Sequence, residues 1–227
     1  EAAEEPREPA VLGQTGPVPL RVQDRHEDAR PDRDRHEEEV VDAGHRELGT
    51  RQVELRQAAV LAPFEARGGA FNIFKTMARK PLAATKFLEW GNYILSKSNS
   101  LPAREREIVI LRTGYNCKSG YEWAQHVVIG KRSGLTDGEV ARIKAGASAP
   151  GWSAADAALI AATDDLSRNH FVSDSSWAEL GKHYSDEQRM DLVYTVGQYT
   201  QVSMLLNSFG VQLDDGLTLD PDLDGRT

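Results

Sequence analysis

The stretch LPAREREIVILRTGYNCKSGYEWAQHVVIGKRSG, residues 101–134, decides the fold of this chain. It predicts two helices joined by a short turn. The first runs from about Pro102 to Tyr115, because proline is favoured in a first helical turn, where its missing N–H costs nothing. The second runs from about Ser119 to Gly134. These two helices carry three polar residues at positions that favour apolar side chains.

Glu107 is the first of the three. On a helical wheel it lies within an apolar stripe that includes Ala103, Ile110, Leu111 and Gly114. A buried carboxylate must be paired or protonated, because desolvation disfavours its charged form. Glu107 is therefore either part of a functional site or a structural group, in a buried ion pair or a subunit contact.

Glu122 and His126 are four residues apart, which places them on one face of the second helix. A carboxylate beside an imidazole can orient it and hold its proton. Each residue also has a structural interpretation. Ser119 and Glu122 have the spacing of a capping box, as do Thr136–Glu139 and Ser185–Gln188, and His126 could be a core histidine with its hydrogen bonds satisfied. The occurrence of all three polar residues in consecutive helices favours a site.

The run from Glu107 through Arg112, followed by the S-x-x-E-x-x-x-H pattern that ends at His126, resembles the carboxymuconolactone decarboxylase family, which includes the alkylhydroperoxidase D-like proteins. Segments 72–81 and 196–209 are also similar to this family, and the resemblance covers about residues 71–216. It implies an all-α helical bundle that forms trimers or hexamers. It also implies decarboxylation of a small carboxylated lactone or related acid.

The resemblance leaves the activity open between branches of the family. The peroxidase branch has a C-x-x-C pair, and its cysteine positions fall on Ser119 and Glu122 here. Cys117 is the sole cysteine and has no partner thiol, so we expect it not to be catalytic and disfavour a thiol peroxidase. A non-catalytic oligomeric helical protein is the third alternative.

For a decarboxylase the predicted catalytic residues are Glu107, Glu122 and His126. His126 would be the acid/base, with Glu122 or Glu107 orienting it, because the carbanion left by carbon dioxide needs a proton donor. Arg106 or Arg112 would bind a substrate carboxylate. We expect no cofactor and no metal: the spacings of the N-terminal histidines match no ligand pattern, and there is no glycine-rich phosphate loop.

The rest of the chain predicts one all-α domain with two flanking segments. No run alternates with period two for long enough to require a sheet. Residues 1–60 lack aromatic side chains and are rich in charge, so we expect disorder there, with a short helix around Glu47 to Leu61. The helical domain covers 61–216, and 217–227 is an acidic tail. Further helices are expected over about 81–97, 136–145 and 185–209. Another begins at the cap Ser153, and one more follows a link at 171–173 and ends near His183.

Composition limits the classes of partner that we expect for this chain. The net charge of −8 and the absence of a dense basic stripe argue against nucleic acid. No apolar run approaches the roughly 20 residues of a membrane span, and we see no secretory signal. With its single cysteine, the chain is expected to be cytoplasmic. The helix over 185–209 is apolar on several faces, which predicts a core position or a homo-oligomeric interface.

Overall fold

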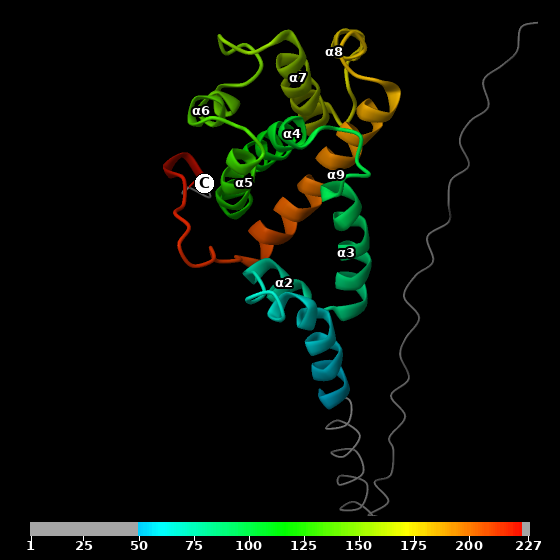
Figure 1. Ribbon diagram of the computed structural model, residues 1–227, viewed down its shortest axis with the longest axis vertical. Coiled ribbons are helices and arrows are strands. Elements are labelled where there is room, and N and C mark those ends of the chain that lie inside the picture. The colour runs from blue at the N-terminus through cyan, green and yellow to red at the C-terminus, as the bar shows by residue number, and fades with distance from the viewer. Residues whose placement is uncertain (1–49, 224–227) are drawn as a thin grey trace, which may run out of the picture. The chain divides into compact units, whose positions relative to one another are not determined.

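The computed structural model describes residues 50–223, and within that range every regular element is a helix (Figure 1). A first helical segment covers 50–65. The elements that follow it are α2 (Asn72–Met77), α3 (Pro81–Leu95), α4 (Ala103–Asn116), α5 (Gly120–Arg132), α6 (Asp137–Ala145), α7 (Ala154–Asn169), α8 (Asp174–Leu180), α9 (Asp186–Phe209) and the short 3₁₀ helix η1 (Pro221–Leu223). The predicted all-α class is therefore confirmed.

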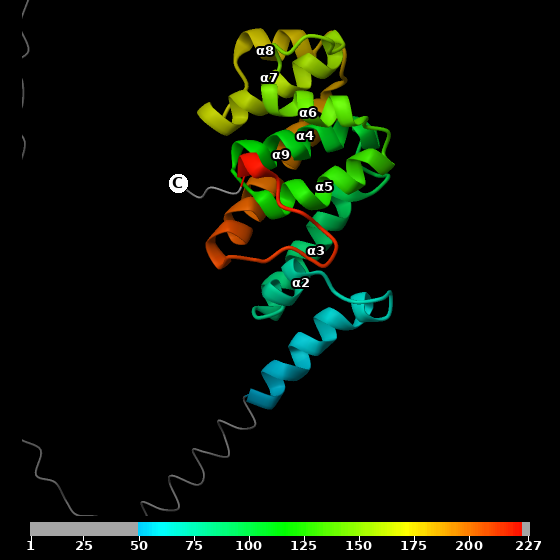
Figure 2. The same ribbon diagram turned by 90° about the vertical axis from the view of Figure 1, so that its left-hand side faces the viewer.

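Helix α4 is the central element of the bundle. It packs against α5, α6, α7 and α9, and Figure 2 shows it enclosed among them. Ile108 to Leu111 are wholly buried, although four successive residues point to all sides of a helix. A helix that is apolar nearly all round is stable only when other elements cover each face.

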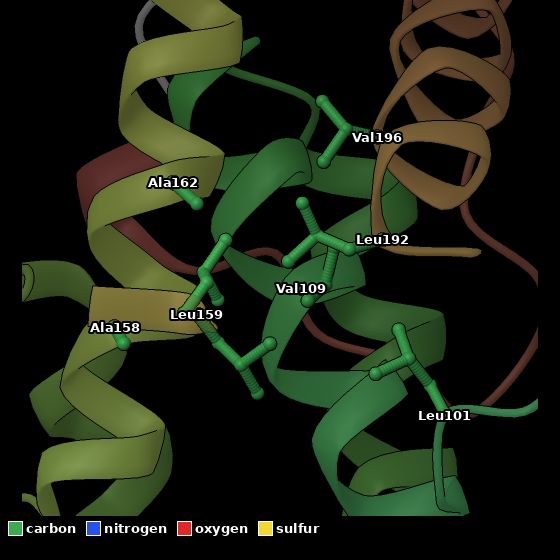
Figure 3. Packing of buried hydrophobic residues seen from close by; sticks show 8 residues of the cluster. Leu101, Val109, Ala158, Leu159, Ala162, Leu192 and Val196 are labelled. Atoms are coloured by element: carbon green, nitrogen blue, oxygen red, sulfur yellow. The ribbon is translucent and has the colours of Figure 1, made fainter. Parts of the chain in front are cut away.

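One core cluster joins α4 to α7, α8 and α9 (Figure 3). In this view Leu159 of α7 points toward Val109 of α4, and Leu192 and Val196 come from α9. Ala158 and Ala162 face the same cluster, so α7 approaches α4 through small side chains. The small side chains of α7 permit this close helix packing.

The helix boundaries follow from capping. Thr136 and Ser185 both form the predicted capping boxes, and Gly210 ends α9 in the left-handed conformation. Helix α8 begins at Asp174, directly after the predicted link, because Ser173 accepts a hydrogen bond from the Ser176 N–H and caps the helix there. It ends at Leu180, three residues before the predicted end near His183.

The flanking segments differ in part from the expectation. Residues 50–60 are helical, in agreement with the short helix expected around Glu47 to Leu61. Their sequence is made mostly of good helix formers, and Phe64 stacks on Phe74 of α2 with ring centroids 4.2 Å apart. The expected disorder of residues 1–49 lies outside the described residues.

The acidic C-terminal segment packs on the domain as far as Leu223. That side chain is 7% exposed and lies in a cluster with Trp123 of α5. Lys144 of α6 holds Asp220 at 2.6 Å and Asp222 at 2.9 Å. The folded unit therefore extends beyond the predicted boundary at residue 216, because a lysine and an apolar surface lie where the tail passes.

Candidate functional site

Glu107, Glu122 and His126 meet in one buried group. The Nδ1 atom of His126 lies 2.7 Å from Glu107 Oε2, and its Nε2 atom lies 3.0 Å from Glu122 Oε1. The three residues are 1%, 3% and 6% exposed. Both ring nitrogens of the imidazole are thus engaged by carboxylates, one from α4 and one from α5. We call this group the Glu107–His126–Glu122 triad.

Two glycines let α4 and α5 approach closely enough to form the triad. A Cβ at Gly114 of α4 would lie 3.4 Å from Glu122 Cγ, and a Cβ at Gly130 of α5 would lie 3.6 Å from Glu107 Cβ. The second position is closed to a larger residue, since the same Cβ would meet Leu135 at 2.9 Å. Each carboxylate stem therefore packs against a glycine of the opposite helix.

Glu122 does not cap its helix. Ser119 is the N-cap residue of α5, but its side chain makes no capping hydrogen bond. The Ser119 hydroxyl is buried without a partner in the described part of the chain. The capping-box interpretation of this pair is therefore wrong: the Glu122 carboxylate turns toward His126, which its i,i+4 spacing also permits.

The electrostatics of the triad favour a protonated imidazole. Burial alone would lower the pKa of His126, but the charges and hydrogen bonds of Glu107 and Glu122 outweigh burial and raise the pKa to about 10. An imidazolium donates from both nitrogens and so satisfies both carboxylates at once. The imidazole of the triad therefore stores a proton in a buried place.

Tyr199 of α9 closes one side of the imidazole. Its ring meets the His126 ring edge-on, with centroids 4.9 Å apart and an interplanar angle of 83°. Burial, and then the negative charges of Glu122 and Glu107, raise the pKa of the Tyr199 phenol well above its ordinary value. Tyr199 is therefore a neutral wall of the site. The sequence offered no motif for it, because it lies among apolar residues on a helix predicted to be buried.

A cavity of about 200 Å³ lies against Glu122 and His126. Its walls come from α2, α3, α5 and α9, and its lining includes the apolar side chains Ile73, Phe74, Phe87, Leu88, Ile129 and Val202. No lysine or arginine lines it in the described part of the chain. The triad thus presents a carboxylate and an imidazole to an apolar space large enough for a small ring compound.

The two arginines considered as substrate ligands are both used by the fold. Arg112 forms a bidentate pair with Asp164 and donates to the carbonyls of Ile143 and Lys144. It lies on a side of α4 that α6 and α7 cover. Arg106 is 8% exposed and donates to the Ser96 carbonyl oxygen at 3.1 Å. Neither arginine lines the cavity of the triad.

Cys117 lies outside the triad cavity. It follows α4 as its C-cap residue and lines a different cavity together with His170 and Thr200. Burial raises the pKa of the Cys117 thiol. A raised thiol pKa leaves less of the nucleophilic thiolate near neutral pH.

Within residues 50–223, no group of three or more potential ligands is placed to hold a metal ion. None of the helices described there combines the length and the hydropathy that a membrane crossing requires.

Solved structures with the same fold define the class of protein. A putative alkylhydroperoxidase D antioxidant defence protein from Agrobacterium tumefaciens is 18% identical, with a TM-score of 0.57 over 61% of this chain and 94% of that chain. A peroxidase-related alkylhydroperoxidase D core protein from Ralstonia eutropha is 18% identical, with a TM-score of 0.62 over 71% and 86%. The debrominase Bmp8 in complex with 2,3,4-tribromopyrrole is 14% identical, with a TM-score of 0.56 over 63% and 76%.

This chain therefore has the alkylhydroperoxidase D-like fold, with a carboxylate–imidazole–carboxylate triad beside an apolar cavity. Residues 81–164, from the start of α3 through most of α7, match the carboxymuconolactone decarboxylase family. That part of the chain is similar to the family, as the pattern from Glu107 to His126 predicted. A search of the curated proteins found no match.

Proposed function

We propose that this protein is an acid–base enzyme of the decarboxylase type, and that Glu122, His126 and Glu107 transfer a proton to a small substrate in the triad cavity. The family is generally enzymatic. One observation carries the proposal: a buried imidazole, held on both nitrogens by carboxylates, borders a cavity instead of being sealed in packed core.

The three residues have different roles in this proposal. Glu122 and His126 border the cavity, whereas Glu107 lies behind them in α4 and does not line it. The His126 imidazolium first passes its Nε2 proton to the Glu122 carboxylate, and Glu122 then gives that proton to the substrate carbon. Glu107 fixes the ring through Nδ1. This arrangement matches the common pattern in which a third group orients the proton-transferring pair.

The reaction balances as follows for a carboxylated substrate. The bond between the carbon atom and its carboxylate breaks, the electron pair stays on the substrate as an enolate, and carbon dioxide leaves. The enolate carbon then takes the proton held by the triad. Water restores that proton at the end of the cycle. No oxidant or reductant is required.

The cavity narrows the substrate class to a small ring acid or lactone with at most one carboxylate. Its lining is largely apolar and contains no lysine or arginine in the described part of the chain, so a second carboxylate would have no cation to pair with. When neutral carbon dioxide leaves, the negative charge stays on the enolate until the proton held by His126 neutralises it.

The same observations support the two alternative functions less well. A thiol peroxidase needs a reactive thiolate and a resolving thiol, but Cys117 is the chain's sole cysteine and its thiol pKa is raised. In a non-catalytic protein, the buried triad would cost desolvation energy with no functional return.

Exchange and carbon dioxide release test the proposal. The protein is incubated in D₂O with a panel of small enolisable lactones and ketones, and deuterium uptake is followed by NMR. Carbon dioxide release is measured with the corresponding monocarboxylic acids. We expect exchange above the buffer rate, reduced about 100-fold or more in Glu122→Gln. Cys117→Ser is the control and retains the wild-type rate. Exchange that is equal in wild type and Glu122→Gln would contradict the proposal.

A further inference from the structure

The amide of Gln198 is an uncommitted polar group in the wall of the triad cavity. Gln198 precedes Tyr199 on α9, is 5% exposed and lines the cavity. Its Oε1 atom is buried and has no hydrogen-bond partner in the described part of the chain. Buried polar groups are nearly always hydrogen-bonded, and an unmade hydrogen bond is costly.

Two other polar side chains of the cavity lining, Gln125 and Tyr121, are already engaged. Gln125 donates to Asp214 at 2.7 Å, and the Tyr121 hydroxyl also donates to Asp214. Gln198 differs because no group within residues 50–223 hydrogen-bonds to its Oε1 atom. The terminal torsion of a glutamine is broad, so the amide can turn toward a molecule in the cavity.

A glycine of α3 leaves space beside the Gln198 amide. Gly91 lies in the interior of α3, where alanine is the better helix former. A Cβ there would be 3.7 Å from Gln198 Nε2 and 3.9 Å from Phe87 Cε1, which are ordinary contact distances. An alanine would therefore fit without a clash, but it would fill the space next to the amide.

We propose that Gln198 and Gly91 form a subsite for a carbonyl oxygen of the substrate, and that Gln198 Nε2 donates a hydrogen bond to that oxygen. This inference rests on the proposed function. When the substrate becomes an enolate, negative charge develops on the carbonyl oxygen, and a pre-placed amide donor stabilises it. The subsite supplies this donor in a cavity wall without lysine or arginine, and it selects lactones and ketones over hydrocarbons of the same shape.

A pair of isosteric probes tests the subsite without relying on turnover. Cyclohexanone carries the carbonyl oxygen, and methylenecyclohexane has a CH₂ group in its place. Binding of each probe is measured by ligand-detected NMR to the full chain. We expect the wild type to bind the ketone about fivefold more tightly, as one neutral hydrogen bond allows. This preference disappears in Gln198→Leu, while methylenecyclohexane binds as before.

Gly91→Ala provides the matched variant on the opposite wall. It should weaken cyclohexanone binding while its melting temperature equals or exceeds that of the wild type, because alanine favours the helix. The subsite is overturned if the wild type does not prefer the ketone, or if Gln198→Leu keeps the preference.

Exchange of the cyclohexanone α-hydrogens in D₂O separates the two proposals. A ketone preference that depends on Gln198, without catalysed exchange, supports the subsite and rejects the acid–base function. Catalysed exchange that requires Glu122, with an unchanged preference in Gln198→Leu, rejects the subsite and supports the function.

Discussion

At the scale of single residues, His126 makes the stability of the fold depend on pH. Its pKa is raised from 6.5 to about 10 by Glu107 and Glu122, against the effect of burial. A raised folded-state pKa stabilises the protein fully below the unfolded value, and this contribution is lost as pH rises through the folded value. We therefore expect the free energy of unfolding in urea to fall between about pH 7 and pH 10.

Removal of one carboxylate checks this prediction. Glu107→Gln leaves a single carboxylate to raise the His126 pKa, so the fall in stability with pH should be smaller than in the wild type. Glu89→Gln is the control, because Glu89 is an exposed carboxylate paired with Lys86 on the surface of α3. Identical pH profiles for Glu107→Gln and the wild type would show that the imidazolium does not stabilise the fold.

The triad also predicts non-additive kinetics. If His126 and Glu107 act as one unit, His126→Ala and Glu107→Gln each remove most of the activity, and the double variant loses little more. Rates of deuterium exchange for the four proteins measure this directly. Losses that multiply in the double variant would indicate independent roles.

The sequence predicted the triad but not the rest of its cavity. Glu107 was identifiable because a carboxylate within an apolar helical stripe needs a partner, and His126 was a candidate for that partner. Arg112 and Gln198 could not be placed by the same reasoning. Their surroundings come from helices distant in the chain, α7 for Arg112 and α3 for Gln198.

At the scale of elements, caps that share one sequence pattern differ in what they do. Ser119 makes no capping bond, whereas Ser185 accepts from the Gln188 N–H and completes a capping box. We expect Ser119→Ala to change the free energy of unfolding by less than about 0.5 kcal/mol, since it removes an unpartnered hydroxyl. Ser185→Ala should cost about 1 kcal/mol. Equal losses in urea denaturation would contradict this distinction.

The sequence pattern predicted which segments are helical better than it predicted where each helix begins and ends. Apolar periodicity and caps located α3 through α9, because each helix buries a face that its own sequence shows. The 3₁₀ helix η1 was missed, because a single apolar residue among aspartates gives no periodic signal. Leu223 is buried only because the Trp123 cluster lies beside it.

Two leucines with opposite environments test the role of the C-terminal segment. Leu223→Ala should destabilise the protein by about 2 kcal/mol, the lower end for a buried leucine. Leu82→Ala on α3 is the matched control and should have little effect, because Leu82 is 75% exposed. A negligible loss for Leu223→Ala would mean that η1 does not stabilise the domain.

At the scale of the whole molecule, the N-terminal segment is expected to be dispensable for folding. Residues 50–59 make almost no buried contact, and the first ring contact of the described chain is that of Phe64 with Phe74. Deletion of residues 1–60 should therefore shift the melting temperature by no more than a few degrees. A larger decrease in a thermal scan would show that the segment contributes to the domain.

We propose that the protein forms a homo-oligomer with α9 in its interface. Apolar side chains on α9 remain exposed in the single chain, including Met190, Met204 and Phe209 at 53%, 63% and 67%. Tyr194 of α9 meets the half-exposed Trp90 of α3 edge-on at 5.3 Å, so apolar surface continues from one helix to the next. Monomeric proteins rarely expose large contiguous apolar patches.

Light scattering at micromolar concentration measures the assembly. We expect a mass that is a multiple of the chain mass, with three or six copies implied by the family resemblance. Met204→Lys should shift the mass toward the monomer, because a buried lysine without a partner is strongly unfavourable. Lys86→Met, which makes the opposite exchange on the exposed face of α3, should leave the mass unchanged. A wild-type protein that scatters as a monomer would show that the exposed face of α9 is solvated in the native state.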